Sequence, residues 1–310
     1  MSKKIVVVGS GAEHLGIRGD IPIVNNKFAN GEINFQYKKS VRGKIVNIIQ
    51  SFPDTNNNIM ELMLMIDAAK RAGASAVNVL LTIFPYSRQD KKHDSGTPIS
   101  AKVVCEMLCS VRPSRVVTID LHAAQIQGFM PNKVGFDHIN SCAFLAYHLK
   151  KQIDDIEDWV FCSPDIGAVK GTLKLGGLCG AQDYVIINKT RKKINEVDSM
   201  DVIGEVGGRK VLIFDDIIDT AGTLECAMKN IFKLGASDVA AIATHGVFSG
   251  PAFDRLKGHK VYVTNTLPIS EDRPSTLTVF NIDKFVLNII NRLNNDEMLS
   301  PLFEKWEEVK

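Results

Sequence analysis

Short apolar runs alternate along the chain with longer segments whose apolar residues recur at helical spacing, and this pattern predicts an α/β protein. Runs of four or more apolar residues are typical of strands buried on both faces, as in parallel sheets. The clearest helix covers residues 59–72, where apolar side chains occupy most of the circumference, and Gly73 is expected to end it. Strands are predicted at residues 5–8, 33–37, 45–49, 77–83, 116–119, 160–162, 184–187, 211–214 and 261–263, and further helices at 99–110, 223–234 and 282–293.

The second half of the chain repeats part of the first. Residues 71–77 and 233–239 share a Gly-Ala-Ser core and align with an offset of 235 − 73 = 162 residues; the same offset places Tyr86 on Phe248. Two ordinary βαβ units that converge on a common turn are the alternative, but duplication accounts better for the shared order and length. We therefore expect two tandem, pseudo-twofold-related domains, residues 1–142 and 143–310, each a mainly parallel sheet flanked by helices. The final segment, residues 293–310, is expected to pack back on the first domain.

Composition narrows the class of protein without identifying it. A length of 310 residues suggests about two domains, at roughly 150 residues each. A hydrophobic content of 45% with a formal net charge of +2 is ordinary for a soluble protein and favours neither nucleic acid nor membrane as a partner. The first apolar run is too short for a signal peptide or a membrane span, so a cytoplasmic protein is predicted. The six cysteines form no CxxC pair and are expected to be buried, reduced thiols.

The most informative stretch is residues 211–223, which joins a predicted buried strand to a predicted helix. Open α/β sheets bind ligands at such a junction, because it lies at the carboxyl end of a strand. The small residues Ala221 and Gly222 allow close backbone approach, and a helix start offers unpaired N–H groups to an anion. Asp215 and Asp216 can accept hydrogen bonds from hydroxyl groups or hold a hydrated metal. An acidic strand end before an ordinary helix start would look similar, but the whole run favours a sugar phosphate.

Two common nucleotide-binding motifs are excluded. Gly9 and Gly11 follow the first strand and begin a dinucleotide fingerprint, but His14 stands where the third glycine is required. The sequence contains no GxxxxGK[ST] motif, so an enzyme that uses ATP here is not a P-loop enzyme. The loop at residues 85–98 is long, charged and poor in apolar residues, which indicates either disorder or a working lid.

Residues 215–223 resemble the phosphoribosyl-diphosphate loop of the type I phosphoribosyltransferase fold. An ordered set of segments over nearly the whole chain resembles the ribose-phosphate diphosphokinase family. These segments are residues 28–32, 40–43, 60–62, 85–90, 120–129, 163–165, 189–193, 215–223 and 244–251. The resemblance implies type I phosphoribosyltransferase-like domains, Mg²⁺ as cofactor, and transfer of the diphosphoryl group of ATP to the anomeric hydroxyl of ribose 5-phosphate.

The resemblance also implies roles for individual residues. It gives Phe28, Asn30, Glu32, Arg88 and Gln89 to ATP; Asp215, Asp216, Asp219, Thr220, Ala221, Gly222 and Thr223 to ribose 5-phosphate; His122 and Asp165 to the metal; and Lys189, Arg191 and His122 to catalysis. Taken singly, His122 fits a core histidine, the basic run at 189–193 fits a solvated turn, and Phe28 fits a core residue. Because all these segments occur in the family's order, a functional role is favoured for each of the three.

The family resemblance further implies a dimer-based homo-oligomer, such as a hexamer, and a response to phosphate and ADP through Ser40, Arg42 and residues 295–300. Four positions depart from the family pattern: Gly96 and Gly171 stand where arginines are usual, His93 occupies a variable position of the loop at 85–98, and Met298 stands where relatives offer a serine hydroxyl. Since a thioether cannot donate a hydrogen bond, weakened phosphate dependence is predicted. Two alternatives stay open at this point, a phosphoribosyltransferase and a non-catalytic regulatory paralogue of the synthetase.

Overall fold

The computed structural model describes residues 3–190 and 199–307, and the chain divides into two compact α/β units. Unit 1 comprises Met1–Ile139, Thr266–Pro268 and Ile282–Leu299, and unit 2 comprises Asn140–Asn265, Ile269–Asn281 and Ser300–Lys310. Where the sequence pattern suggested a division after residue 142, the chain changes unit after Ile139. The segment Ile282–Leu299 belongs to unit 1, whereas the chain from Ser300 onward belongs to unit 2.

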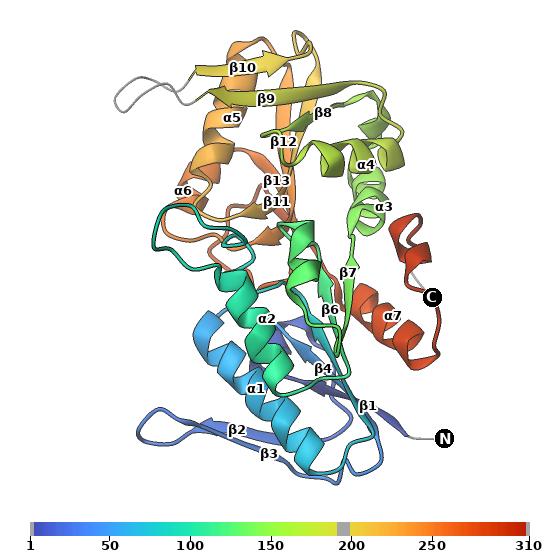
Figure 1. The fold of residues 1–310 in the computed structure, drawn as a ribbon. Helices are drawn as coiled ribbons and strands as arrows, with labels where there is room; N and C mark the ends of the chain where they lie inside the picture. The colour runs from blue at the N-terminus through green and yellow to red at the C-terminus, as the bar shows by residue number, and fades with distance from the viewer. Residues whose placement is uncertain (1–2, 191–198, 308–310) are drawn as a thin grey trace. The chain divides into compact units, whose positions relative to one another are not determined.

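Unit 1 is built on a five-stranded parallel sheet in the order β1-β4-β5-β6-β7 (Figure 1). Its strands are β1 (Lys4–Val8), β4 (Ile45–Gln50), β5 (Ala76–Leu81), β6 (Arg115–Ile119) and β7 (Gly135–Ile139). Its helices are η1 (Ser10–Leu15), α1 (Thr55–Arg71), α2 (Ser100–Ser110), η2 (Ala124–Phe129) and α7 (Asp283–Asn294). The predicted helix at 59–72 begins a turn earlier, at Thr55, because its first turn is polar and carries no apolar periodicity.

The two faces of this sheet bury different partners. Val46 and Ile48 belong to the apolar core formed with α1 and α2. Asn47 lies between them in the strand and points to the opposite face, since side chains alternate along a strand. There its amide donates a 3.0 Å hydrogen bond to Asn294 of α7. One face is therefore closed by α1 and α2 and the other by α7.

A two-stranded antiparallel hairpin, β2 (Ile23–Lys27) with β3 (Ile33–Tyr37), packs on α1. The Tyr37 hydroxyl donates to the Met65 carbonyl over 2.9 Å, and the Asn25 amide donates to the Glu61 carboxylate over 2.7 Å. The β3 strand is the one predicted at 33–37. The β2 strand lacks a clear sequence signal, because its two apolar residues are followed by three polar ones.

Unit 2 contains a seven-stranded sheet in the order β10-β9-β8-β11-β12-β13-β14, parallel except for the β9–β10 pair. Its strands are β8 (Val160–Ser163), β9 (Tyr184–Thr190), β10 (Ser199–Ile203), β11 (Lys210–Ile218), β12 (Asp238–Gly246), β13 (Lys260–Thr264) and β14 (Leu277–Phe280). Its helices are α3 (Cys142–Gln152), η3 (Ile156–Asp158), α4 (Val169–Cys179), α5 (Gly222–Lys233), α6 (Ala252–Leu256) and η4 (Ser300–Phe303). The sequence pattern did not predict α3 or α4; three glycines lie within α4 and obscure its helical signal.

The internal repeat predicted from the sequence is present in the backbone. Gly73 and Gly235 both have positive φ, at 81° and 91°, and each ends the turn before a central strand. At the far end of those strands, Tyr86 and Phe248 both adopt the left-handed conformation, with φ of 59° and 53°. Residues other than glycine seldom adopt this conformation, so its recurrence at the 162-residue offset supports duplication over convergence.

All six cysteines are free thiols, and four of them, Cys105, Cys142, Cys162 and Cys179, are buried as predicted. Burial raises the pKa of Cys105, Cys162 and Cys179 to about 12 in each case. Cys109 is half-buried, and Cys226 is exposed. Within the described residues, no helix has the length and apolar character needed to cross a membrane.

Candidate active site

The central element of unit 2 is β11, which is longer than the predicted strand at 211–214. It runs from Lys210 to Ile218, so Asp215 and Asp216 lie within its carboxyl half and not in the following loop. Asp215 pairs in register with Ala243 of β12, and the strand is extended by the pairing of Ile217 with His245. The predicted strand is present but longer than the apolar run that located it, because pairing with β12 continues past Phe214.

The connection from β11 to α5 contains only Asp219, Thr220 and Ala221. Ala221 holds the left-handed conformation at φ 59°, which turns the chain sharply into α5. The first N–H groups of a helix have no partner within the helix, and they carry the positive end of its dipole. Thr220 and Thr223 are exposed beside them. This turn therefore presents backbone N–H and hydroxyl donors to an anion.

Arg255 of α6 supports this turn, a role that no sequence pattern indicated. Its guanidinium donates a 2.8 Å hydrogen bond to the Thr220 carbonyl and lies 3.7 Å from the Glu225 carboxylate. A Cβ added at Gly222 would come within 3.0 Å of the same guanidinium. A side chain at position 222 would consequently crowd this guanidinium, which would have to shift by a few tenths of an ångström.

Three carboxylates gather at the carboxyl end of β8 and β11. The pKa of Asp215 lies well above its ordinary value, chiefly through burial and then through the negative charge of Asp216, with a smaller contribution from Asp165. Asp165 is exposed after β8, where its carboxylate accepts a 3.0 Å hydrogen bond from the Ala168 N–H. Mutual repulsion of this kind is relieved by a bound cation or by hydroxyl donors.

The fit of these carboxylates to Mg²⁺ is partial. Among the described residues, no group of three His, Cys, Asp or Glu side chains is placed to hold a metal by itself. Mg²⁺ usually keeps several waters and takes one or two carboxylates together with substrate phosphates, so a protein-only cage is not required. The donor set around Asp165 and Asp215 is therefore compatible with Mg²⁺ carried by a phosphorylated substrate.

Gly171, one of the positions that departs from the family pattern, is fixed by packing in α4. A Cβ at this position would lie 2.7 Å from the ring of Phe214, a buried residue of β11. An arginine there would require the ring to move.

In unit 1, His122 follows β6, where the backbone takes an unusual path. Asp120 is buried and has φ of 32°, which few residues other than glycine adopt. The next N–H, that of Leu121, donates a 3.0 Å hydrogen bond to Nε2 of His138 on β7. His138, which the sequence analysis missed, therefore shapes the turn that presents the exposed His122.

The base of the loop at 85–98 is fixed by several hydrogen bonds. The Tyr86 hydroxyl donates to Asn56 of α1 over 2.6 Å, and the Gln89 N–H donates to the Tyr86 carbonyl over 3.0 Å. The Gln89 side-chain oxygen accepts a hydrogen bond from Ser100, the first residue of α2. Arg88 and Gln89 are exposed, and the following residues 91–96 are exposed as well. The loop therefore has an anchored base and a solvated outer part, as expected of a lid.

The tip of the β2–β3 hairpin carries Phe28, Asn30 and Glu32. Asn30 accepts a 3.2 Å hydrogen bond from the Glu32 N–H, and the turn is closed by the 2.8 Å bond from the Phe28 N–H to the Glu32 carbonyl. Phe28 is 54% exposed, so the alternative of a core residue is wrong. Figure 1 shows the hairpin tip apart from the loop at 85–98 on unit 1. The two predicted parts of the ATP site are thus not brought together within unit 1.

Lys189 lies in β9, paired in register with Met200 of β10. The side chain of Lys189 and the whole of Arg191 fall outside the described residues.

Comparisons with known proteins identify the family. Residues 12–111 match the model for the N-terminal domain of ribose phosphate pyrophosphokinase, and residues 182–304 match the phosphoribosyl synthetase-associated domain. A ribose-phosphate pyrophosphokinase of Clostridium perfringens is 40% identical over 283 residues, covering 89% of this chain and 88% of that protein. One from Wolinella succinogenes is 39% identical over 300 residues, covering 95% and 94%. The crystal structure of phosphoribosylpyrophosphate synthetase from Mycobacterium smegmatis superposes with a TM-score of 0.86 at 36% identity, covering 95% of this chain and 100% of that chain. The chain belongs to the ribose-phosphate pyrophosphokinase family.

Proposed function

We propose that this chain is a ribose-phosphate diphosphokinase, an enzyme that transfers the diphosphoryl group of ATP to the anomeric hydroxyl of ribose 5-phosphate. The anomeric oxygen attacks the β-phosphorus of ATP, the bond from that phosphorus to the oxygen bridging it to the α-phosphorus breaks, and AMP leaves. The hydroxyl proton is lost to solvent. The observation that carries the proposal is the identity of about 40% to ribose-phosphate pyrophosphokinases over most of the chain.

The turn from Asp219 to Thr223 is proposed to bind the 5-phosphate of the ribose. The N-terminus of α5 supplies unpaired N–H groups and a positive dipole end, and Thr220, Ala221 and Gly222 place no bulky side chain over them. Asp215 and Asp216 are proposed to accept hydrogen bonds from the ribose hydroxyls. Hydroxyl donors would offset the repulsion that raises the pKa of Asp215, so this carboxylate pair suits such a ligand.

The nucleotide is proposed to contact Arg88 and Gln89 at the fixed base of the lid, while the exposed ring of Phe28 stacks on adenine with Asn30 and Glu32 beside it. Because the hairpin tip lies apart from the lid on unit 1, these two groups would serve one ATP only across two copies of the chain. This geometry supports the proposal of a dimer-based homo-oligomer, such as a hexamer. The proposed substrates are ATP and ribose 5-phosphate.

His122 and Asp165 are proposed to hold Mg²⁺ with the ATP phosphates. When bound, the ion would neutralise phosphate charge and orient the diphosphoryl group. Lys189 and Arg191 are proposed to stabilise the charge that develops on the transferred group, since phosphoryl transfer depends on positioning and positive charge more than on a covalent nucleophile. The protein is further proposed to act in the cytoplasm.

Regulation by phosphate and ADP is proposed to be weakened in this chain. Arg42 and Ser40 are exposed, and the Ser40 hydroxyl accepts a 3.3 Å hydrogen bond from the Arg42 N–H. Met298 is 74% exposed and offers a thioether where a hydroxyl would donate. An anion bound through Arg42 and Ser40 therefore has one donor fewer than in relatives with a serine at this position.

The decisive experiment is a coupled assay of AMP with ATP, Mg²⁺ and ribose 5-phosphate. AMP release that depends strictly on ribose 5-phosphate, with a sugar diphosphate visible by ³¹P nuclear magnetic resonance, is expected. Consumption of phosphoribosyl diphosphate with a nucleobase, without AMP release, would instead identify a phosphoribosyltransferase. Binding of both substrates without turnover would identify a non-catalytic paralogue.

A further inference from the structure

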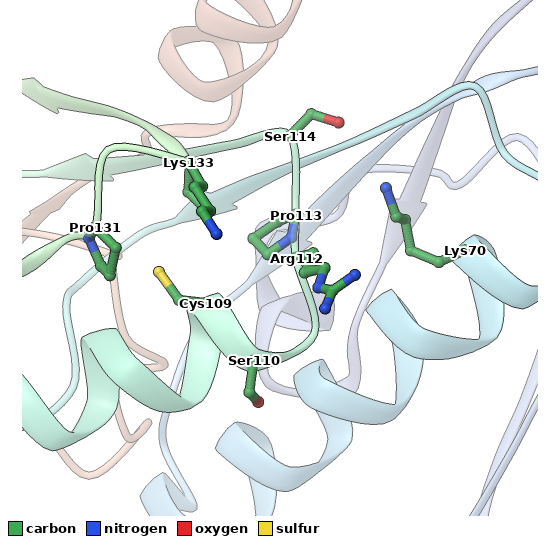
Figure 2. A pocket seen from close by; sticks show the side chains of 9 residues that line it. Lys70, Cys109, Ser110, Arg112, Pro113, Ser114, Pro131 and Lys133 are labelled. Carbon is green, nitrogen blue, oxygen red and sulfur yellow. The ribbon is translucent and has the colours of Figure 1, made fainter.

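A cavity of about 720 Å³ opens at the amino end of the unit 1 sheet (Figure 2). Three separate segments form it: the last turn of α1, the turn between α2 and β6, and the turn that precedes β7. Its lining residues are Lys70, Cys109, Ser110, Arg112, Pro113, Ser114, Pro131, Lys133 and Val134. The segments proposed for catalysis in this unit, in contrast, follow the carboxyl ends of β5 and β6. The cavity is thus separate from the proposed active site, and its size is within the usual range of about 300–1,000 Å³ for small-molecule sites.

The cavity is positively charged. Lys70, Arg112 and Lys133 line it, and no acidic side chain of the described residues does. Figure 2 shows Lys133 near Cys109, with the Arg112 guanidinium turned toward Lys70. Like charges repel when they are placed together, so such a cluster is stabilised by a bound anion.

Two positively charged residues close to the cavity in sequence do form ion pairs, unlike the three that line it. Arg71, next to Lys70, pairs with Asp67 at 2.6 Å, and Arg115, at the start of β6, pairs with Asp137. By contrast, none of the three cations around the cavity forms an ion pair with a carboxylate in the described part of the chain. Three cations without a carboxylate partner in the described part of the chain therefore line one cavity.

Arg112 is held in place by a strained and fixed turn. Its φ of 55° is left-handed, a conformation that favours glycine or asparagine over arginine. The turn is closed by a 3.1 Å hydrogen bond from the Arg112 N–H to the Cys109 carbonyl. Two bonds between Ser114 and Val77 of β5, at 2.7 and 3.1 Å, then fix it to the sheet. An arginine kept where asparagine would be less strained points to a use for its guanidinium.

Apart from Ser110 and Ser114, the rest of the lining is apolar. Pro113 and Val134 are buried, and Pro131 and the half-buried Cys109 lie beside them. Three positively charged side chains next to apolar ones suit a ligand that has a phosphate group and an apolar organic part. We propose that this cavity binds a phosphate-bearing small molecule, with Arg112, Lys70 and Lys133 on the phosphate and the prolines and Val134 against the remainder.

The test uses Cys109 as a reporter inside the cavity. The full-length protein is alkylated with N-ethylmaleimide in the presence of increasing inorganic phosphate or guanosine monophosphate, and the modified peptides are quantified by mass spectrometry. Ligand in the cavity should slow modification of Cys109 several-fold. Cys226, an exposed thiol of α5 beside the turn proposed for the 5-phosphate, reports separately on binding there. A ligand bound at the proposed active site would not shield Cys109, so this readout does not depend on the proposed function.

Two variants and a charge-matched control complete the experiment. Arg112→Asn and Lys133→Gln should each raise the concentration required for protection by about 10–100-fold, the loss typical of one charge-assisted hydrogen bond. Lys102→Gln removes the same charge from an exposed side chain of α2 that pairs with Glu106 at 3.6 Å, and it should behave like the wild type. Because asparagine suits the left-handed conformation, Arg112→Asn should keep or raise Tm.

The two ligands distinguish the source of the phosphate group. Protection by guanosine monophosphate at lower concentration than by inorganic phosphate indicates an organic phosphate, and equal or better protection by inorganic phosphate indicates the free anion; both support the proposal. Absence of protection by both ligands would overturn it. The proposal would also be overturned if Arg112→Asn lowered Tm, or if either variant changed the molar mass of the assembly, since Arg112 would then serve folding or a contact between copies.

Discussion

Gln125 donates a hydrogen bond from its side-chain amide to the buried carboxylate of Asp90. Asp90 belongs to the base of the lid, next to Arg88 and Gln89, and Gln125 belongs to η2, directly after His122 and the turn at the end of β6. This single contact joins two segments that are 35 residues apart in sequence and that both carry proposed site residues.

Substitution of Gln125 tests whether that contact positions the site. Gln125→Leu leaves the Asp90 carboxylate without a charge-assisted partner, a loss worth roughly 1.5–3 kcal/mol. We expect the kcat/KM for ATP to fall about 10-fold or more, because the lid base and the His122 turn lose their common anchor. Gln127→Leu is the control, since Gln127 is exposed on the same element and its side-chain amide donates to the Ala124 carbonyl over 3.0 Å, within η2 and its own turn. Equal activity of the two variants would contradict the positioning role.

Glu61 is expected to hold the hairpin that carries Phe28. This buried carboxylate accepts hydrogen bonds from the Ser10 N–H at 2.7 Å, the Asn25 amide at 2.7 Å and the Asn58 amide at 3.2 Å. In Glu61→Ala these donors lose their acceptor, which costs about 1–3 kcal/mol for each one. The free energy of unfolding, measured by denaturant titration, should therefore fall by about 3 kcal/mol or more.

Hydrogen exchange distinguishes a local from a general effect of this substitution. The substitution should speed up amide exchange in β2 and β3 relative to the wild type, and should speed it up less in β5. The reason is that Asn25, on β2, loses its hydrogen-bond partner. Glu106→Ala, which removes an exposed carboxylate from α2, should alter neither measurement appreciably. Uniform acceleration across unit 1 would rule out the specific link to the hairpin.

Asp215→Asn should stabilise the ligand-free protein while weakening ribose 5-phosphate binding. The folded-state pKa of Asp215 is raised by burial and by Asp216, so folding favours its protonated form. That contribution to stability is fully present below the unfolded-state pKa and is lost as the pH rises through the folded-state pKa. Asparagine resembles the protonated acid, so the Tm of the variant should exceed that of the wild type at pH 8, and the difference should shrink toward pH 4. A gain of ~1 kcal/mol would raise Tm by about 2–4 °C in a unit of this size. A lower Tm at pH 8 would show that the ionised carboxylate has a stabilising partner.

Lys189→Ala and Arg191→Ala should lower kcat and kcat/KM together. An interaction made mainly in the transition state affects both quantities equally, and the loss of one such donor is worth about 2.7–4 kcal/mol by analogy with oxyanion stabilisation. Steady-state kinetics with both substrates varied provide the measurement. If only the KM values changed, the two residues would bind substrate and not the developing charge.

Arg88→Ala and Thr223→Ala should separate the two substrates. Arg88 lies in unit 1 beside the proposed nucleotide contacts, and Thr223 lies in the first turn of α5 in unit 2. The first variant should raise the KM for ATP more than that for ribose 5-phosphate, and the second should do the reverse. Matching changes in both constants would argue against this division of the site.

The sequence by itself determined the features that depend on neighbouring residues in the chain. Apolar runs located most of the strands, helical spacing located α1, α2, α5 and α7, and the 162-residue offset revealed the repeat. The run from Asp215 to Thr223 also located the turn proposed to bind the 5-phosphate, because the donors that make such a turn are consecutive. These signals succeed because burial and backbone preference act over a few residues and leave a local period.

Only the tertiary structure decided which distant residues act together. The hydrogen bonds that Glu61 accepts from Ser10 and Asn25 span 51 and 36 residues, and the bond from Arg255 to Thr220 spans 35. The cavity at Arg112 likewise joins three separate segments of the chain. These contacts leave no periodic pattern or fixed spacing in the sequence, because they depend on where separate strands and helices end in the folded structure. The extension of β11 through Asp215 is a further case: pairing with β12 supplies hydrogen bonds that a count of apolar residues cannot register. Local sequence thus placed the chemistry along the chain, and long-range packing placed it in the fold.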